Sequence, residues 1–471
     1  MQGFFFGGRF QASPKKILLD FNGTALILTF QNKKNVNNTE QLYQLFKQHP
    51  NIVTDSRKIA PGCLFFALKG ERFNGNDFAA QAIEQGAAYA IVDEEVALPS
   101  GKAVRVEDVL ASLQSLANYH RRQFNIPVLA ITGSNGKTTT KELISAVLAS
   151  QYPTHFTKGN LNNHIGVPLT LLAMPAGTEV AVVEMGANHP GDIDFLCRIA
   201  EPTHGLITNV GKAHLEGFGG FEGVKQTKSE LYRFLAERHG LVFINKDEPF
   251  LSDLASGNRL RLFYTKSEAP NPDTVPFEVK LVAEEPFLEV AFLNEDGQLV
   301  HAKSQLIGQY NFNNLMTAVV VGKYFKVPSA KIIAALENYV PSNNRSQLKA
   351  IGSNHYILDA YNANPTSMKM AIDAFAKLPA QHKVAILGAM KELGVYSQAE
   401  HSSMAKLAAE SGFGQVVLVG EEFEEAAKQT GAVYFKYTTE LKDWYRQQIF
   451  EGTHFLIKGS RSIGLEAMLE E

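Results

Sequence analysis

The stretch ITGSNGKTTTKE, residues 131–142, contains the residue types that hold a phosphate group. Gly133 and Gly136 permit a tight turn before a helix, whose first backbone N–H groups would point at phosphate oxygens. Lys137 can reach the β- and γ-phosphates, and the threonine after it suits Mg²⁺. The stretch departs from the strict phosphate-loop pattern, because Ile131 stands where its first glycine would be. We predict a nucleotide site here; the alternative is a glycine-rich turn before an ordinary helix.

Two residues elsewhere could complete a metal site beside this loop. Glu184, in VVEMGANHPGDI, ends a buried strand, and ligands bind at that edge of an open parallel sheet. A carboxylate there would repel a nucleotide unless a divalent cation lay between them, although Glu184 could also face solvent. His214, in NVGKAHLEGFG, is either a metal ligand or a loop histidine. By spacing alone, Lys225 and Lys228 look like solvated helix lysines.

These residues need strands and helices to bring them together. The strand NIPVLAIT leads into the glycine loop, and the helix after it has Leu143, Ile144, Val147 and Leu148 on one face. Further buried strands, EVAVVEMG, HGLITNV and GLVFIN, alternate with helical stretches. This alternation predicts a parallel sheet covered on both faces. Residues 276–307 alternate in polarity and are interpreted as an antiparallel insertion.

At 471 residues the chain is too long for one hydrophobic core. We predict an α/β protein of three tandem domains: a small α/β domain at 39–124, a central ATP-binding domain at 125–341 and a Rossmann-like domain at 342–471. The last contains the strands HYILDAY, KVAILGAM, QVVLVG and HFLIKGS. Residues 1–38 are interpreted as an N-terminal extension of unknown role, without the pattern of a signal peptide.

Composition excludes several classes of protein. The net charge of −3 gives no general attraction to nucleic acid, and no apolar run approaches the roughly 20 residues that span a bilayer. The only cysteines, Cys63 and Cys197, are far apart and lack metal-ligand spacing, which favours a reducing cytoplasm. We therefore expect a cytoplasmic protein, a monomer, whose partners are small molecules.

Eight motifs in chain order resemble the Mur ligase family: AITGSNGKTTTKE, GNLNNHIGVPLTLL, EMGANHPGDI, TNVGKAHLEGFG, GQYNFNN, DAYNANPTSM, LGAMKELG and KGSRS. The resemblance covers the chain from about Thr39 to its end, and it implies that the domain at 39–124 binds the UDP-muropeptide. It implies an ATP-dependent peptide ligase of peptidoglycan precursor synthesis that forms a C–N bond. NLNN, YNANP and KGSRS resemble the members that join D-alanyl-D-alanine to UDP-N-acetylmuramoyl-tripeptide through an acyl phosphate. Whether the third residue of the tripeptide is diaminopimelate or lysine stays open.

The resemblance also implies a role for each matching residue. Catalytic roles fall on Lys137, His214, Lys228 and Arg345. The nucleotide would be held by Thr132, Gly133, Ser134, Asn135, Gly136, Lys137, Thr138, Thr139, Asn311, Asn314, Arg345 and Asp359. Mg²⁺ would be held by Thr138, Glu184, His214 and Lys228. Substrate would meet Ser56, Arg57, Asn160, Asn162, Asn163, Tyr361, Asn362 and Arg461.

Within these sets the resemblance places Asn311 and Asn314 at adenine, Arg345 at the γ-phosphate and Asp359 at the ribose. Lys228 matches a lysine that the family carbamylates with CO₂, which turns a cation into an anion; Lys225 is the alternative in register. Taken singly, each residue has an ordinary interpretation, such as a surface arginine, a strand-end aspartate or a helix N-cap asparagine. The competing functions are another Mur ligase, a folylpolyglutamate synthase, or a nucleotide-binding protein without catalysis.

Overall fold

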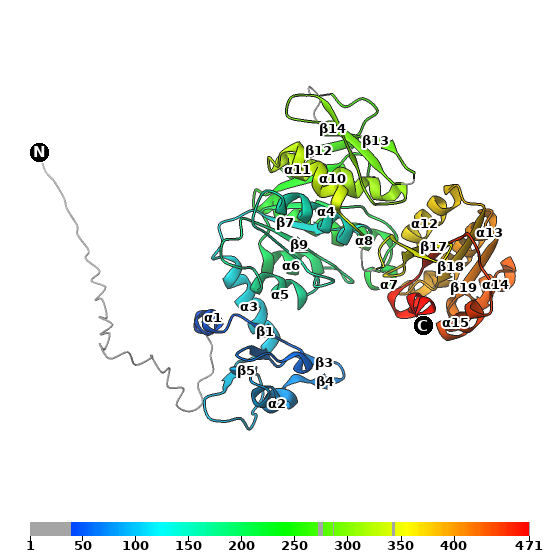
Figure 1. Ribbon diagram of the computed structural model, residues 1–471. Coiled ribbons are helices and arrows are strands. Elements are labelled where there is room, and N and C mark those ends of the chain that lie inside the picture. The colour runs from blue at the N-terminus through cyan, green and yellow to red at the C-terminus, as the bar shows by residue number, and fades with distance from the viewer. Residues whose placement is uncertain (1–38, 272–276, 286, 342–343, 471) are drawn as a thin grey trace, which may run out of the picture.

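The computed structural model describes residues 39–271, 277–285, 287–341 and 344–470 (Figure 1). The extension interpreted at residues 1–38 lies outside the described residues. Three α/β domains follow one another along the chain, drawn in blue to cyan, cyan-green to yellow-green, and yellow to red in Figure 1. The predicted fold class is confirmed, while the predicted domain boundaries stay predictions. No described helix is long and apolar enough to cross a membrane.

The N-terminal domain is a small four-stranded parallel sheet in the order β1-β2-β5-β6. Its strands are β1 (Ile52–Val53), β2 (Leu64–Phe66), β5 (Tyr89–Val92) and β6 (Ala103–Arg105), with a short hairpin of β3 (Lys69–Gly70) and β4 (Phe73–Asn74). Its helices are α1 (Thr39–Gln48), α2 (Ala79–Glu84) and α3 (Val109–Arg121), with 3₁₀ turns at Ser56–Lys58 and Gly75–Phe78. Helix α3 packs against the central domain and joins the two.

The central domain is built on a nine-stranded sheet in the order β15-β14-β13-β12-β11-β10-β7-β9-β8. The parallel strands are β7 (Val128–Thr132), β8 (Thr154–Phe156), β9 (Val180–Glu184), β10 (His204–Ile207), β11 (Leu241–Asn245) and β12 (Leu260–Lys266). β13 (Phe277–Ala283) pairs parallel with β12, and β14 (Glu289–Leu293) and β15 (Leu299–Lys303) continue antiparallel. The antiparallel segment therefore extends the main sheet.

Helices cover both faces of this sheet, as the near-continuous apolar strands require. Leu129 and Ile131 of β7 join the core under α4 (Lys137–Ala149), α10 (Phe312–Tyr324) and α11 (Ser329–Asn338). Val128 and Ala130 point to the other face. That face is covered by α5 (Gly166–Leu172), α6 (Asp192–Ala200) and α8 (Phe221–Glu237), with the short α7 (Leu215–Phe218) and α9 (Leu251–Leu254) nearby.

The C-terminal domain is a six-stranded sheet in the order β16-β17-β21-β18-β19-β20. Its strands are β16 (Gln347–Ile351), β17 (Asn354–Asp359), β18 (His382–Gly388), β19 (Gln415–Val419), β20 (Val433–Phe435) and β21 (Thr453–Lys458). Its helices are α12 (Pro365–Lys377), α13 (Ser397–Glu410), α14 (Glu424–Thr430) and α15 (Thr438–Arg446). Only the β16–β17 pair is antiparallel among these strands, so the Rossmann-like prediction is confirmed.

The order of the central strands fixes where a ligand can bind. β7 lies between β9 and β10, so the chain leaves β7 toward one edge of the sheet and later returns on its other side. Such a reversal opens a crevice at the carboxyl ends of the strands. The glycine loop occupies this position, between the ends of β7 and α4.

Candidate active site

The glycine loop depends on two positions where a side chain does not fit. Gly133 has φ +139° and Gly136 has φ +78°, in a region that L-residues with side chains rarely adopt. A Cβ added to Gly133 would lie 2.0 Å from the Thr208 hydroxyl oxygen, and one on Gly136 would lie 2.6 Å from Asn314 Oδ1. The loop is thus packed directly against the segment after β10 and against α10.

Hydrogen bonds to the segment after β10 fix the loop further. Asn209 Oδ1 accepts from the Asn135 amide at 3.0 Å, and the Thr208 hydroxyl donates to the Asn135 carbonyl at 2.7 Å. Lys137 Nζ donates to the carbonyls of Gly133 and Ser134, at 2.8 and 3.2 Å. Burial lowers the pKa of Lys137, whereas the nearby charge of Glu184 opposes that shift. The loop is therefore rigid before any ligand arrives.

Glu184 lies at the end of β9 as predicted, beside Thr138. The Thr138 hydroxyl donates to Glu184 Oε1 at 3.1 Å, and Asn162 Nδ2 donates to the same oxygen at 2.8 Å. The other oxygen, Oε2, is buried without a hydrogen-bond partner in the part of the chain that the structure describes. A buried carboxylate oxygen in this state costs free energy unless a cation or donor meets it. Carboxylate and hydroxyl oxygens are the ligands that Mg²⁺ prefers, so these two residues fit the cation.

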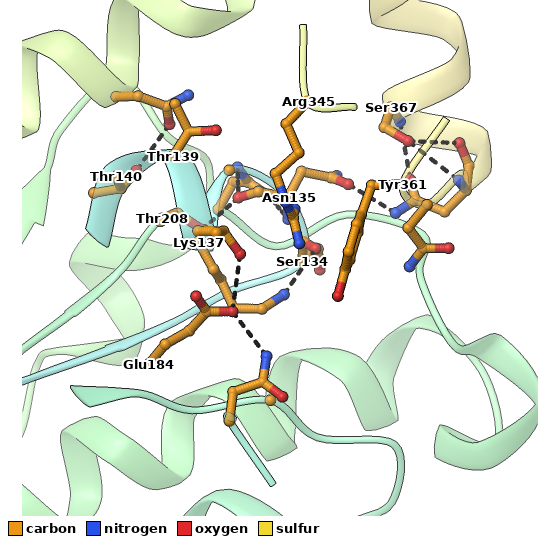
Figure 2. Close-up of a pocket in the computed structure, with 18 of the residues that line it drawn as sticks. Ser134, Asn135, Lys137, Thr139, Thr140, Glu184, Thr208, Arg345, Tyr361 and Ser367 are labelled. Atoms are coloured by element: carbon orange, nitrogen blue, oxygen red, sulfur yellow. Dashed lines mark hydrogen bonds between the residues drawn. The ribbon is translucent and has the colours of Figure 1, made fainter. Parts of the chain in front are cut away.

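The cavity at this edge has a volume of about 630 Å³ and is lined by two domains of one chain. Figure 2 shows Arg345 reaching from the linker toward the glycine loop, beside the ring of Tyr361. The Arg345 guanidinium carbon lies 3.6 Å from the centre of that ring, a stacking contact that holds it in place. Asp359 Oδ2 accepts from Lys458 Nζ at 2.6 Å on the same wall. Positive groups from separate domains thus line one cavity.

Three models of known domains match the chain in order. They are the Mur ligase family catalytic domain at 50–131, the Mur ligase middle domain at 131–322 and the Mur ligase glutamate ligase domain at 344–461. The UDP-N-acetylmuramoyl-tripeptide–D-alanyl-D-alanine ligase of Bacillus subtilis is 34% identical over 438 residues, which cover 89% of this chain and 92% of that protein. The chain belongs to the Mur ligase family.

Solved structures support the same membership. The MurF crystal structure from Acinetobacter baumannii is 30% identical, with a TM-score of 0.79 over 92% of this chain and 97% of the other. MurF from Thermotoga maritima, solved in complex with ADP, is 27% identical with a TM-score of 0.76, over 90% and 96% of the two chains. The three-domain α/β architecture is therefore that of the Mur ligases.

The Mur ligase motifs bring most predicted nucleotide residues to the cavity. Its lining includes Ser134, Asn135, Gly136, Lys137, Thr138, Thr139, Asn311, Asn314, Arg345 and Asp359. Thr132 and Gly133 lie beneath it; the Thr132 hydroxyl donates to the Met185 carbonyl at 2.8 Å. Asn311 and Asn314 are buried and bonded to each other, since Asn314 Nδ2 donates to Asn311 Oδ1 at 2.8 Å. Their predicted contact with adenine stays a prediction.

The remaining predicted metal residues differ in position. His214 lines the cavity at the start of α7, and its Nδ1 forms an ion pair with Glu392 of the C-terminal domain. Lys228 of α8 is 1% exposed, lies outside the lining of the cavity, and has no ion-pair partner among the described residues. No cluster of three His, Cys, Asp or Glu side chains is arranged for a metal in the part of the chain that the structure describes.

Burial and the nearby charge of Lys137 lower the pKa of Lys228 well below that of a free lysine. Lys225, the alternative in register, instead pairs with Glu222 at 2.8 Å, and its half-buried side chain lies with Nζ 4.5 Å from the centre of the Phe250 ring. The solvated interpretation is therefore wrong for Lys228 and fits Lys225 only in part. A buried lysine with a lowered pKa is the form that can react with CO₂, because only the neutral amine is a nucleophile.

The predicted substrate residues divide into two groups. Asn162, Asn163, Tyr361 and Asn362 line the cavity. Ser56, Arg57, Asn160 and Arg461 lie outside its lining. The Arg57 side chain is 85% exposed and bonded only to neighbouring Asp55, and Arg461 pairs with Glu466 at 2.8 Å. The N-terminal domain thus presents Ser56 and Arg57 away from the phosphate site, where a long substrate would be needed to connect them.

The lining residues of this Mur ligase that sequence reasoning missed include Asn209, Glu248, Asn364 and Lys458. Asn364 caps α12 and also donates from Nδ2 to Asn135 Oδ1 at 2.7 Å, which links the C-terminal domain to the glycine loop. A signal existed for Asn209 and Lys458, because each stands at or just after the carboxyl end of a buried strand. Glu248 lies three residues beyond β11, where no pattern distinguishes it from a surface acid.

Proposed function

We propose that this protein is an ATP-dependent peptide ligase that joins D-alanyl-D-alanine to UDP-N-acetylmuramoyl-tripeptide, with Mg²⁺ and in the cytoplasm. One observation carries the proposal: the glycine loop with Lys137, the carboxylate of Glu184, and Arg345 and Asp359 of the next domain line a single cavity. The relatives named for this reaction, covering about nine-tenths of the chain, support it. Because one chain supplies both walls, a monomer is sufficient.

The proposed reaction must bring two anions together. A carboxylate oxygen of the tripeptide attacks the γ-phosphorus of ATP, which forms an acyl phosphate and releases ADP. The loop N–H groups, Lys137 and Arg345 offset the negative charge that gathers there. The amino group of D-alanyl-D-alanine then attacks the acyl carbon, loses a proton and expels phosphate. The stacking of Arg345 on Tyr361 holds the guanidinium in position before the substrate binds.

Thr138 and Glu184 would hold the Mg²⁺, with His214 and a carbamylated Lys228 as further proposed ligands. When bound, the ion supplies positive charge to the phosphate oxygens. The free Oε2 of Glu184 supports this role most directly, since it is buried and has no other partner. Asn162 keeps that carboxylate oriented through its bond to Oε1.

The proposal is tested by mass spectrometry of the product. Purified protein is given ATP, Mg²⁺, D-alanyl-D-alanine and UDP-N-acetylmuramoyl-tripeptide containing either diaminopimelate or lysine. We expect the mass of the dipeptide adduct and one ADP per product. Product with glutamate or another single amino acid as the acceptor amine would instead indicate a different ligase of this family. Absence of ADP with every acceptor would contradict the proposal in favour of nucleotide binding alone.

A further inference from the structure

One carboxylate in the cavity has no role in the reaction described above. Glu248 follows β11 and is half-buried in the lining, where its Oε1 accepts from Asn313 Nδ2 at 2.8 Å. Its Oε2 has no hydrogen-bond partner among the described residues. Burial raises the pKa of Glu248 to about 6, so the group is still ionised at neutral pH. An ionised acceptor that faces a cavity with one free oxygen favours a ligand that donates a hydrogen bond.

The order of the strands shows which part of a nucleotide would reach Glu248. Along the carboxyl edge, β11, β10, β7 and β9 follow one another, with Glu248 after the first and Glu184 at the end of the last. The glycine loop after β7 holds the phosphates, and the proposed cation site at Glu184 lies on the β9 side of it. The end of the nucleotide opposite the metal-bound phosphate therefore extends toward β10 and β11. Two strand spacings amount to about 10 Å, a distance suited to ribose plus base.

The neighbouring asparagine side chains are already hydrogen-bonded within the protein, so Glu248 is the group left to bind the base. Asn314 Oδ1 accepts from the Thr140 hydroxyl at 2.9 Å, and its Nδ2 donates to Asn311. Asn311 Nδ2 in turn donates to the Ile307 carbonyl at 2.8 Å. These side chains bond to each other and to the protein frame. On this side of the cavity, among the described residues, Glu248 Oε2 is the carboxylate oxygen that remains available.

We propose that Glu248 selects the base of the nucleotide: its Oε2 accepts a hydrogen bond from the exocyclic 6-amino group of adenine, while Asn313 holds the carboxylate in place. The inference rests on the proposed use of ATP and names the residue that distinguishes it from other purine nucleotides. A 6-oxo purine such as hypoxanthine presents an acceptor at that position, which the carboxylate repels. A purine without a substituent at position 6 loses the bond.

The test is equilibrium binding by calorimetry, without acceptor substrates, of ATP, purine riboside triphosphate and inosine triphosphate. A hydrogen bond to a charged group corresponds to a preference of about tenfold or more for ATP over the unsubstituted purine. We expect that preference in the wild type. In Glu248→Ala the ratio of the affinities for ATP and for purine riboside triphosphate should fall to about one. In Glu248→Gln the side-chain amide can donate to a 6-oxo group, so the affinity for inosine triphosphate should rise relative to that for ATP.

The matched control is Asp247→Asn. Asp247 is next to Glu248 but lies outside the cavity lining, and its two oxygens accept from the Thr265 hydroxyl and the Lys266 amide, at 2.6 and 2.7 Å. The Asp247→Asn variant should leave the ratio of the affinities for ATP and for the other two nucleotides unchanged. If Glu248→Ala does not fold, Glu248→Gln alone decides, because an unchanged ratio of the affinities for inosine triphosphate and ATP in that variant overturns the inference.

The outcomes separate this inference from the proposed function. Ligation by the wild type together with an unchanged ratio in both Glu248 variants would overturn base selection only. A preference for ATP that depends on Glu248, in a protein that ligates no acceptor, would support base selection and contradict the proposed ligase reaction.

Discussion

Single side chains set the charge of the cavity, and Lys137 has the largest effect. It lies on the glycine loop, and two carbonyls hold its ammonium there. Replacing Lys137 with Ala should lower the rate of ADP formation with full substrates by about 10²-fold or more, the cost of losing one preorganised group that stabilises developing charge. The control is Lys406→Ala, whose exposed lysine pairs with Glu410 on α13. Equal rates in the two variants would contradict the assigned role.

Lys228 provides a second test on the scale of one residue. Because its amine is buried and its pKa is lowered, we expect it to form a carbamate with CO₂. Nuclear magnetic resonance of protein equilibrated with ¹³C-bicarbonate should show a carbamate signal in the wild type and in Lys225→Ala, and none in Lys228→Ala. A signal that disappears in Lys225→Ala instead would assign the modification to Lys225, the less buried of the two lysines, against the burial argument.

On the scale of elements, the turn between β7 and α4 requires glycine for two separate reasons. Gly133 has positive φ and also no room for a Cβ, whereas Gly177 has φ +88° with nothing within 4 Å of a Cβ. Gly177→Ala should therefore show only backbone strain, of order 1–3 kcal/mol. Gly133→Ala should lose a further ~1–3 kcal/mol through the clash with Thr208, and should weaken ATP binding. Denaturant unfolding measures the free energy of unfolding of both variants. Equal losses would show that the segment after β10 moves aside from the added Cβ without cost.

The same element shows what the sequence could and could not predict. The strand before the loop and the helix after it were predicted correctly, and Leu143, Ile144, Val147 and Leu148 are all buried. Local periodicity carries that information, because each residue's environment repeats within a few positions. The bond between Asn364 and Asn135 joins residues 229 positions apart. The residues around Asn135 and Asn364 show no periodic pattern that depends on such a contact, so the link between the domains was not predictable from the sequence. Glu248 was missed for the same reason.

On the scale of the whole molecule, polar contacts join the central and C-terminal domains, and the contact of His214 with Glu392 is one of them. Besides Asn364 and Asn135, the Lys212 amide donates to the Thr366 hydroxyl at 3.0 Å, and Lys212 Nζ pairs with Glu400 at 2.5 Å. The Lys212–Glu400 pair is partly exposed and is worth at most about 1 kcal/mol. An interface of this kind permits the domains to separate for substrate entry and release.

The contact of Asn364 with the glycine loop can be removed without losing the helix cap that the same residue provides. Asn364→Ser keeps an oxygen for the N3 amide of α12, because serine is a good N-cap, but its side chain is too short to reach Asn135. Asn135 Oδ1 then loses its donor, which should favour separation of the domains. We expect a melting temperature close to that of the wild type, a larger radius of gyration by solution scattering without ligands, and a higher KM for ATP. An ATP analogue with muropeptide should restore the compact profile. Identical scattering of wild type and variant, with and without these ligands, would show that the two domains move as one body and that catalysis needs no closure.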